Sequence, residues 1–176
     1  MQLRTLAALA LPLALLACAR EEAPPAPASV SISRPPQGPA VSDAAFVATN
    51  GSIDLFAIRS SELVLQRSSS ARVREFAETM IRDHRGTSGQ LSLEGRRLNL
   101  LPSATLRPAE QAMFDALQSS SRFDADYVRD QRIIHEQAVA LDAAYLASGR
   151  SPTLRPVAAA ALPIEQRHER LLAYLS

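Results

Sequence analysis

Three histidines are the residues of this chain whose type and spacing could support chemistry. They are His84, His135 and His168, the only histidines in the 176 residues, and each falls on the apolar stripe of a different predicted helix, where a leucine would be usual. If the second and third long helices run antiparallel, each histidine lies about 21–24 Å from the same end of the bundle. We therefore expect the three imidazoles to share one interior layer.

A carboxylate could complete this histidine layer. The first long helix places Asp54 and Ala57 at the same height, one turn apart on one face. Three imidazoles and a carboxylate can bind zinc, copper, nickel or iron, so the predicted ligands are the three histidines and Asp54, and the predicted cofactor is a divalent transition metal. The alternative is a buried hydrogen-bond network, in which each imidazole is satisfied by a neighbour such as Gln131. Three flanking acids are expected in salt bridges at the rim rather than as ligands: Asp83, Glu136 and Glu169.

Hydrophobic periodicity indicates helices from residue 43 onward. Apolar residues recur every three to four positions, and the sequence has no strand pattern, no glycine-rich phosphate loop and no paired cysteines. The predicted helices span about residues 43–67, 70–98, 108–119, 123–148 and 152–175. Four long amphipathic helices, with one short helix between the second and the third, predict an all-α fold, an antiparallel four-helix bundle.

The N-terminal segment resembles a bacterial lipoprotein signal. Residues 1–17 contain a short apolar run after an early arginine, which is too short to span a bilayer and is typical of a secretory signal. The run ends in Leu-Leu-Ala-Cys, so we expect Cys18 to carry lipid and to anchor the protein in the membrane. An ordinary signal peptide with an incidental cysteine is the alternative. Residues 18–42, rich in proline, predict an extended tether, and residues 43–176 form the bundle domain.

The expected cellular location of the protein and the charge of its bundle domain limit the functions that it can have. By resemblance to lipoproteins of double-membraned bacteria, Ala19 after the cysteine directs the protein to the outer membrane, with the domain facing the periplasm. From Ser42 onward sixteen arginines balance sixteen acidic residues without forming a basic stripe, which argues against nucleic acid as a partner. No nucleophile, base and orienting group form a recognisable set, so catalysis is not predicted.

Three stretches of the sequence resemble one bacterial family. They are "IRSSELVLQRSSSARVREFAETMIRDH", "FDADYVRDQRIIHEQAVAL" and "LPIEQRHERLL". These motifs are similar to those of the family catalogued as domain of unknown function 4142, whose members are exported, often lipid-anchored proteins with a ferritin-like helical bundle. The resemblance covers about residues 43–176, and the matching motif positions are Asp83, His84, Phe123, Asp124, Tyr127, His135, Leu162, Pro163 and His168.

The family resemblance implies no established activity. Members commonly carry glutamate where this chain has Ala57, so the resemblance implies that Asp54 has to substitute if a metal site is intact here. Di-iron ferritins use two Glu-x-x-His pairs, whereas only Glu165 and His168 have that spacing here, which argues against ferroxidase chemistry. The sequence thus predicts a non-enzymatic envelope lipoprotein with a binding or stress-related role and an unidentified protein partner. Metal binding by the histidine layer is the alternative.

Overall fold

The computed structural model describes residues 40–175, and all of the regular structure within them is helical. The helices are α1 (Asp43–Arg67), α2 (Ala71–Arg96), α3 (Pro108–Gln118), α4 (Phe123–Ser148) and α5 (Leu154–Leu172), followed by a 3-10 turn, η1 (Ala173–Leu175). The predicted all-α class and the short extra helix are therefore confirmed. The predicted signal peptide, Cys18 and nearly all of the tether lie outside the described residues. Within the described part, no helix is long and apolar enough to cross a bilayer.

The helix ends follow local sequence signals. Ser42 accepts a hydrogen bond from an N–H in the first turn of α1 at 3.2 Å, and Ser70 does the same for α2 at 3.4 Å, so each serine caps the helix that follows it. Pro108 stands at the start of α3, where its missing N–H has no intrahelical partner to lose. α5 continues through Pro163, which is exposed, so water can reach the carbonyl that this proline leaves unpaired.

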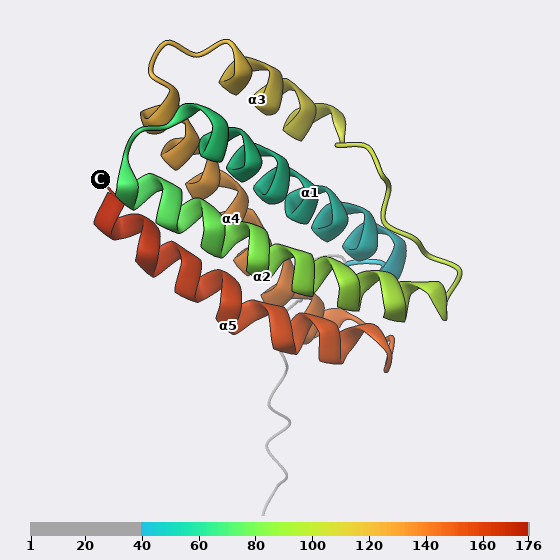
Figure 1. Cartoon of the computed structure of the whole chain (residues 1–176). Helices are drawn as coiled ribbons and strands as arrows, with labels where there is room; N and C mark the ends of the chain where they lie inside the picture. Colours follow the sequence, from blue (N-terminus) through green and yellow to red (C-terminus); the bar gives the residue numbers. More distant parts are fainter. Residues whose placement is uncertain (1–39, 176) are drawn as a thin grey trace, which may run out of the picture. The chain divides into compact units, whose positions relative to one another are not determined.

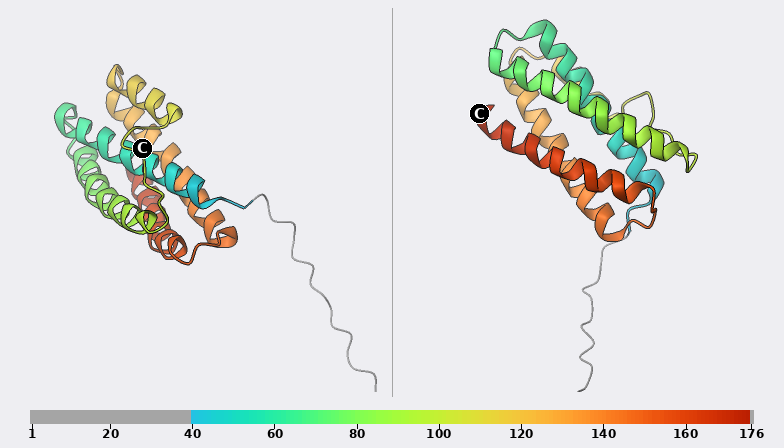
Figure 2. Two further views of the ribbon diagram at one scale, coloured as in Figure 1. Left: turned by 90° about the vertical axis from the view of Figure 1, so that its right-hand side faces the viewer. Right: turned by 60° about the horizontal axis from the view of Figure 1, so that its bottom comes forward.

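The four long helices pack as a square (Figure 1). α1 lies against α2 and α4, and α5 also lies against α2 and α4, so α2 and α4 occupy one diagonal. Each pair of adjacent long helices runs antiparallel, which can be followed in both views of Figure 2. α3 lies outside the square, along α1, and also contacts α4. The predicted antiparallel bundle is therefore confirmed.

The predicted heights of the histidines assumed that the second and third long helices run antiparallel. These helices are α2 and α4, and they run parallel across their diagonal. At one end of the bundle the end of α1, the starts of α2 and α4 and the end of α5 meet through Val64, Val73, Phe123 and Leu172. At the other end the remaining helix ends meet through Phe46, Leu91, Tyr145 and Leu154. The cause is the connection of residues 97–122, which returns along the bundle through α3 before α4 begins. His84 and His135 lie near the middles of their helices, so their heights agree for either direction.

The core changes character at mid-height. Both ends are packed with aliphatic and aromatic side chains, whereas the middle holds buried polar ones. Seven of these polar residues are at most 4% exposed: Asp54, His84, Gln131, His135, Asp142, Glu165 and His168. Burying so many polar groups is costly unless they bind one another or a ligand. This polar layer is therefore where a functional site is expected.

Candidate metal centre

The three histidines converge from three helices. His84 comes from α2, His135 from α4 and His168 from α5, and all three are completely buried. The Nε2 atom of His135 lies 3.2 Å from Nε2 of His84 and 3.1 Å from Nδ1 of His168. The ring centroids are 5.1–5.3 Å apart. The structure thus brings the three imidazoles into one interior layer, as the sequence indicated.

The outer nitrogen of each ring faces an oxygen atom. His84 Nδ1 lies 2.8 Å from Oδ1 of Asp54, His135 Nδ1 lies 2.6 Å from the backbone carbonyl of Gln131, and His168 Nε2 lies 3.0 Å from Oδ2 of Asp83. A carbonyl or a carboxylate can only accept, so each outer nitrogen carries the proton and donates it. A neutral imidazole protonated on its outer nitrogen has a lone pair on its inner one. The three inner nitrogens therefore direct lone pairs at a common region.

Two nitrogen lone pairs at this separation repel each other unless a proton or a metal ion lies between them. Ligand nitrogens about 2.0 Å from one tetrahedral metal ion lie roughly 3.3 Å from each other. The two inner N···N distances of 3.2 and 3.1 Å are close to that value. Hydrogen-bonding the outer ring nitrogen to a carboxylate or a backbone carbonyl is also the usual way in which proteins orient metal-binding histidines. The arrangement is therefore suited to a metal ion.

Glu165 supplies a fourth inward group. Its Oε2 atom lies 3.6 Å from Nε2 of His135 and 3.9 Å from Nδ1 of His168, and it has no hydrogen-bond partner. One ligand atom from each of the three histidines and Glu165 can be chosen so that all four lie within 4.8 Å of one another. Glu165 precedes His168 by three positions, so the two side chains share a face of α5. Sequence reasoning noted this spacing only as half of a di-iron motif, and did not include Glu165 among the predicted ligands.

Asp54 and Ala57 lie elsewhere than the predicted metal site requires. Asp54 stands behind His84, on its outer nitrogen, and also accepts a hydrogen bond from Thr87 at 2.8 Å. It orients a candidate ligand rather than joining the four converging groups. Ala57 is completely buried in an apolar cluster with neighbours such as Ile134. The carboxylate that faces the histidines comes from α5 and not from α1.

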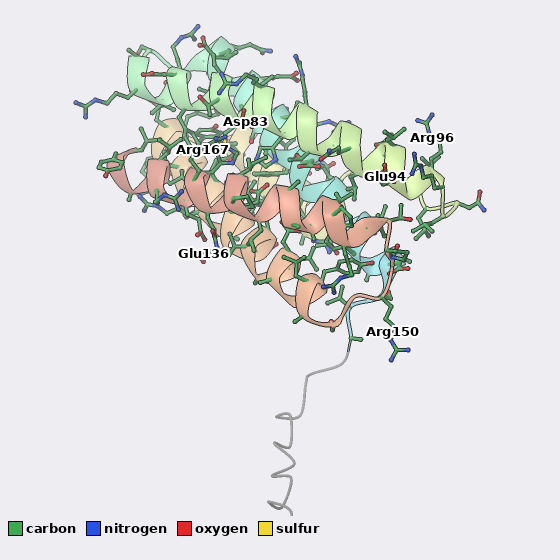
Figure 3. The ribbon with its side chains drawn as sticks, turned by 90° about the horizontal axis from the view of Figure 1, so that it is seen from below. Asp83, Glu94, Arg96, Glu136, Arg150 and Arg167 are labelled. Atoms are coloured by element: carbon green, nitrogen blue, oxygen red, sulfur yellow. The ribbon has the colours of Figure 1, made fainter. Side chains whose placement is uncertain are left out.

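The flanking acids behave differently from one another. Asp83 forms the expected salt bridge, with its Oδ2 atom 2.6 Å from Nη2 of Arg167, and Figure 3 shows these two residues facing each other between α2 and α5. The same oxygen accepts the hydrogen bond from His168, so Asp83 also orients that ring. Glu136 is exposed on α4 (Figure 3), and Glu169 is partly exposed on α5.

The charges in this layer are unevenly distributed. Burial raises the pKa of Glu165 to about 7. Burial and the neighbouring His84 lower the pKa of His168 to about 4, and burial lowers the pKa of His135 well below its ordinary value. Burial opposes charge on His84 as well, but the carboxylates of Glu165 and Asp54 outweigh it and raise the pKa of His84. Without a metal, one proton on His84 relieves only one of the two close N···N contacts.

Solved structures share this fold. The Cu(II)-bound form of CopM aligns with a TM-score of 0.65 and 16% identity, over 77% of this chain and 96% of CopM. The Cu(I)-bound form of CopM gives a TM-score of 0.64 at 15% identity, over 76% of this chain and 94% of CopM. A DUF305 fragment from Deinococcus radiodurans gives a TM-score of 0.66 at 18% identity, over 80% of this chain and 97% of the fragment. Identities this low establish the common fold alone.

Sequence comparison identifies the family directly. No curated protein matches the sequence significantly. The family model described as "Domain of unknown function (DUF4142)" matches residues 28–174, in agreement with the resemblance found in the motifs. Because this match spans most of the chain, the protein belongs to the DUF4142 family.

Proposed function

We propose that the bundle binds one transition metal ion through His84, His135, His168 and Glu165. The observation that carries this proposal is the set of outer contacts: each imidazole donates its outer proton to an oxygen, so three inner lone pairs converge beside a buried carboxylate. A hydrogen-bond network accounts for only part of this arrangement, because a proton on Nε2 of His84 can bridge to Nε2 of His135 at 3.2 Å but leaves the contact between His135 and His168 at 3.1 Å without a proton.

Copper(II) is the first metal to test. Three imidazoles and a carboxylate suit Cu(II), Zn(II), Ni(II) or Fe(II), whereas Cu(I) prefers sulfur ligands, which this set lacks. Among divalent ions of the first transition row, Cu(II) generally binds such ligands most tightly. The fold is shared with CopM, which has been solved with Cu(II), Cu(I) and silver bound. These points together support a copper-binding role.

The site favours holding a metal over catalysis. All four ligand groups come from the protein and are at most 3% exposed. Catalytic metal sites keep a position open for water or substrate, whereas closed sites hold the ion. This agrees with the non-enzymatic role predicted from the sequence. We propose buffering or sequestration of the metal as the function.

We place this role in the cell envelope. The support is the short apolar run that ends in Leu-Leu-Ala-Cys, followed by the proline-rich segment of residues 18–42. A lipid on Cys18 would anchor the protein to the outer membrane, and the tether would hold the bundle in the periplasm. The metal-binding domain would then meet ions entering the cell.

Metal titration of protein purified without a histidine tag tests the site. We expect one Cu(II) ion per chain, measured by calorimetry and elemental analysis. His84→Ala, His135→Ala and His168→Ala should each abolish this binding, and a double variant should lose no more than a single one, because one missing ligand already disables the set. Glu136→Gln, which changes an exposed carboxylate one position from His135, is the matched control and should bind normally.

The same variants address the hydrogen-bond alternative. If the histidines form only a buried network, no metal binds and each substitution lowers the stability of the protein by roughly 1–3 kcal/mol. Absence of stoichiometric binding by the unmodified protein would therefore refute the proposal.

A further inference from the structure

A buried metal site needs a route to solvent. The three histidines are completely buried and Glu165 is 3% exposed, so an ion cannot reach them in the closed bundle. One small cavity of about 10 Å³ touches the site at Glu165. It is just large enough to hold one water molecule. Glu165 lines this cavity, and its Oε2 atom has no hydrogen-bond partner.

Polar side chains lead from this cavity towards the surface. Its polar lining consists of Glu165, Asp54, Asn50 from α1 and Thr87 from α2, and its remaining lining is apolar: Leu91, Val157 and Ala161. Asn50 and Thr87 are only half-buried, whereas Asp54 is 4% exposed. The Thr87 hydroxyl donates to Oδ1 of Asp54 at 2.8 Å and so closes the outer side. The cavity thus offers successive oxygen ligands between solvent and the carboxylate of the site.

The turn of α2 beside this cavity is a weak stretch of helix. It reads Gly86-Thr87-Ser88-Gly89, and a Cβ atom at either glycine would meet nothing within 4 Å. Packing therefore does not require glycine at these two positions. Gly95 in the same helix is different, because a Cβ atom there would collide with the carbonyl of Leu100. Glycine inside a helix favours local opening, since it loses the most backbone freedom when the helix forms.

We infer that the turn Gly86–Gly89 is the port through which the metal ion enters and leaves the His–Glu site. This inference rests on the proposed metal binding and adds its route. Opening of this turn separates Thr87 from Asp54, so the two oxygens can receive an ion and pass it to Glu165. One turn before Thr87 on α2, Asp83 closes the seam between α2 and α5, where its carboxylate lies 2.6 Å from Arg167 (Figure 3). The same carboxylate lies 3.0 Å from His168.

Exchange kinetics test the port. The variant carrying both Gly86→Ala and Gly89→Ala has room for the added methyl groups and should fold normally. We expect it to slow both Cu(II) uptake, followed by quenching of tyrosine fluorescence, and Cu(II) transfer to an excess of a chromophoric chelator. Two helix-favouring substitutions should slow each process by about 5- to 30-fold and leave the equilibrium affinity within about 2-fold. Thr79→Ala also raises helix propensity in α2, but away from the cavity, and should leave both rates unchanged.

The possible failures are distinguishable. Unchanged rates in the double variant of a protein that binds Cu(II) would overturn the port alone. Equal slowing by Thr79→Ala would also overturn it, because the effect would then come from the general stability of α2. Unchanged rates in the glycine variant together with faster exchange in Arg167→Ala would move the route to the seam between α2 and α5. Absence of Cu(II) binding by the unmodified protein would refute the metal site itself.

Discussion

Replacing Glu165 with glutamine should make the metal-free protein more stable while removing metal binding. Burial raises the pKa of Glu165 to about 7 from an ordinary value of 4.5. Between these two pH values the folded protein retains a proton that the unfolded chain has lost, so stability falls as pH rises through this window and is lowest above pH 7. The difference corresponds to about 3 kcal/mol. Glutamine has the same shape but no charge, so it avoids this loss.

Two features of the site set the size of that gain. Glu165 is 3% exposed, so water does not screen its charge appreciably. Its negative charge does support the proton on His84, however, and the variant loses that interaction. The figure of about 3 kcal/mol is therefore an upper bound at pH 8, and the gain should vanish below pH 4.5.

Urea denaturation of the chelator-treated protein at pH 4.5 and pH 8 measures this effect. Cu(II) titration of the same samples measures the loss of affinity, which should reach at least about 100-fold, since a carboxylate ligand becomes a neutral amide. Glu136→Gln removes an exposed carboxylate and should change neither property. Lower stability of Glu165→Gln than of the unmodified protein at pH 8 would refute the electrostatic reasoning. Unchanged Cu(II) affinity would exclude Glu165 as a ligand.

Three further outcomes follow from the sequence and the site. Metal affinity should fall as pH drops below about 7, because the raised pKa values of Glu165 and His84 force an entering ion to displace protons; calorimetry in buffers of different ionisation enthalpy measures this release, and pH-independent binding would contradict it. Ala57→Glu should not improve Cu(II) binding, because Glu165 already fills the fourth position, and it should lower the melting temperature, because a charge enters an apolar cluster. Cys18→Ser should release the protein from membranes into the soluble envelope fraction, and an unchanged membrane fraction and mass would rule out the lipid anchor.

The histidine layer was predictable because it depends on only two features of each histidine: its place on the apolar face of its helix and its height along the bundle. Hydrophobic periodicity located the long helices to within a few residues, and the rise per residue then gave the level of each histidine. The predicted layer is correct although α4 runs in the direction opposite to the one assumed, because His84 and His135 lie near the middles of their helices. The direction of α4 depends on whether residues 97–122 turn back at once or return along the bundle. Local sequence does not determine that path.

To predict which residues are ligands, the face of each helix has to be known as well as the height of each residue. Asp54 has the right level, but rotation of α1 about its axis places it behind His84 rather than facing the centre. Glu165 has the right level and the right face, and its spacing from His168 was visible in the sequence. The sequence analysis compared this Glu-x-x-His spacing only with di-iron ferritins, which need two such pairs, and therefore did not consider Glu165 as a ligand. The outer partners of the rings include a backbone carbonyl, that of Gln131, which no side-chain pattern reveals.

The convergence of three helices on one point has a consequence for the lifetime of the protein. In the sequence, His84 and His135 are 51 residues apart, and His135 and His168 are 33 residues apart. An ion held between them would cross-link α2, α4 and α5 in a domain whose described residues include no cysteine. Because the unfolded chain lacks the site, bound metal would suppress unfolding in proportion to its concentration above the dissociation constant. Proteases act on the opened form, so the loaded bundle would outlast the empty one, and metal supply would set how much of the protein accumulates.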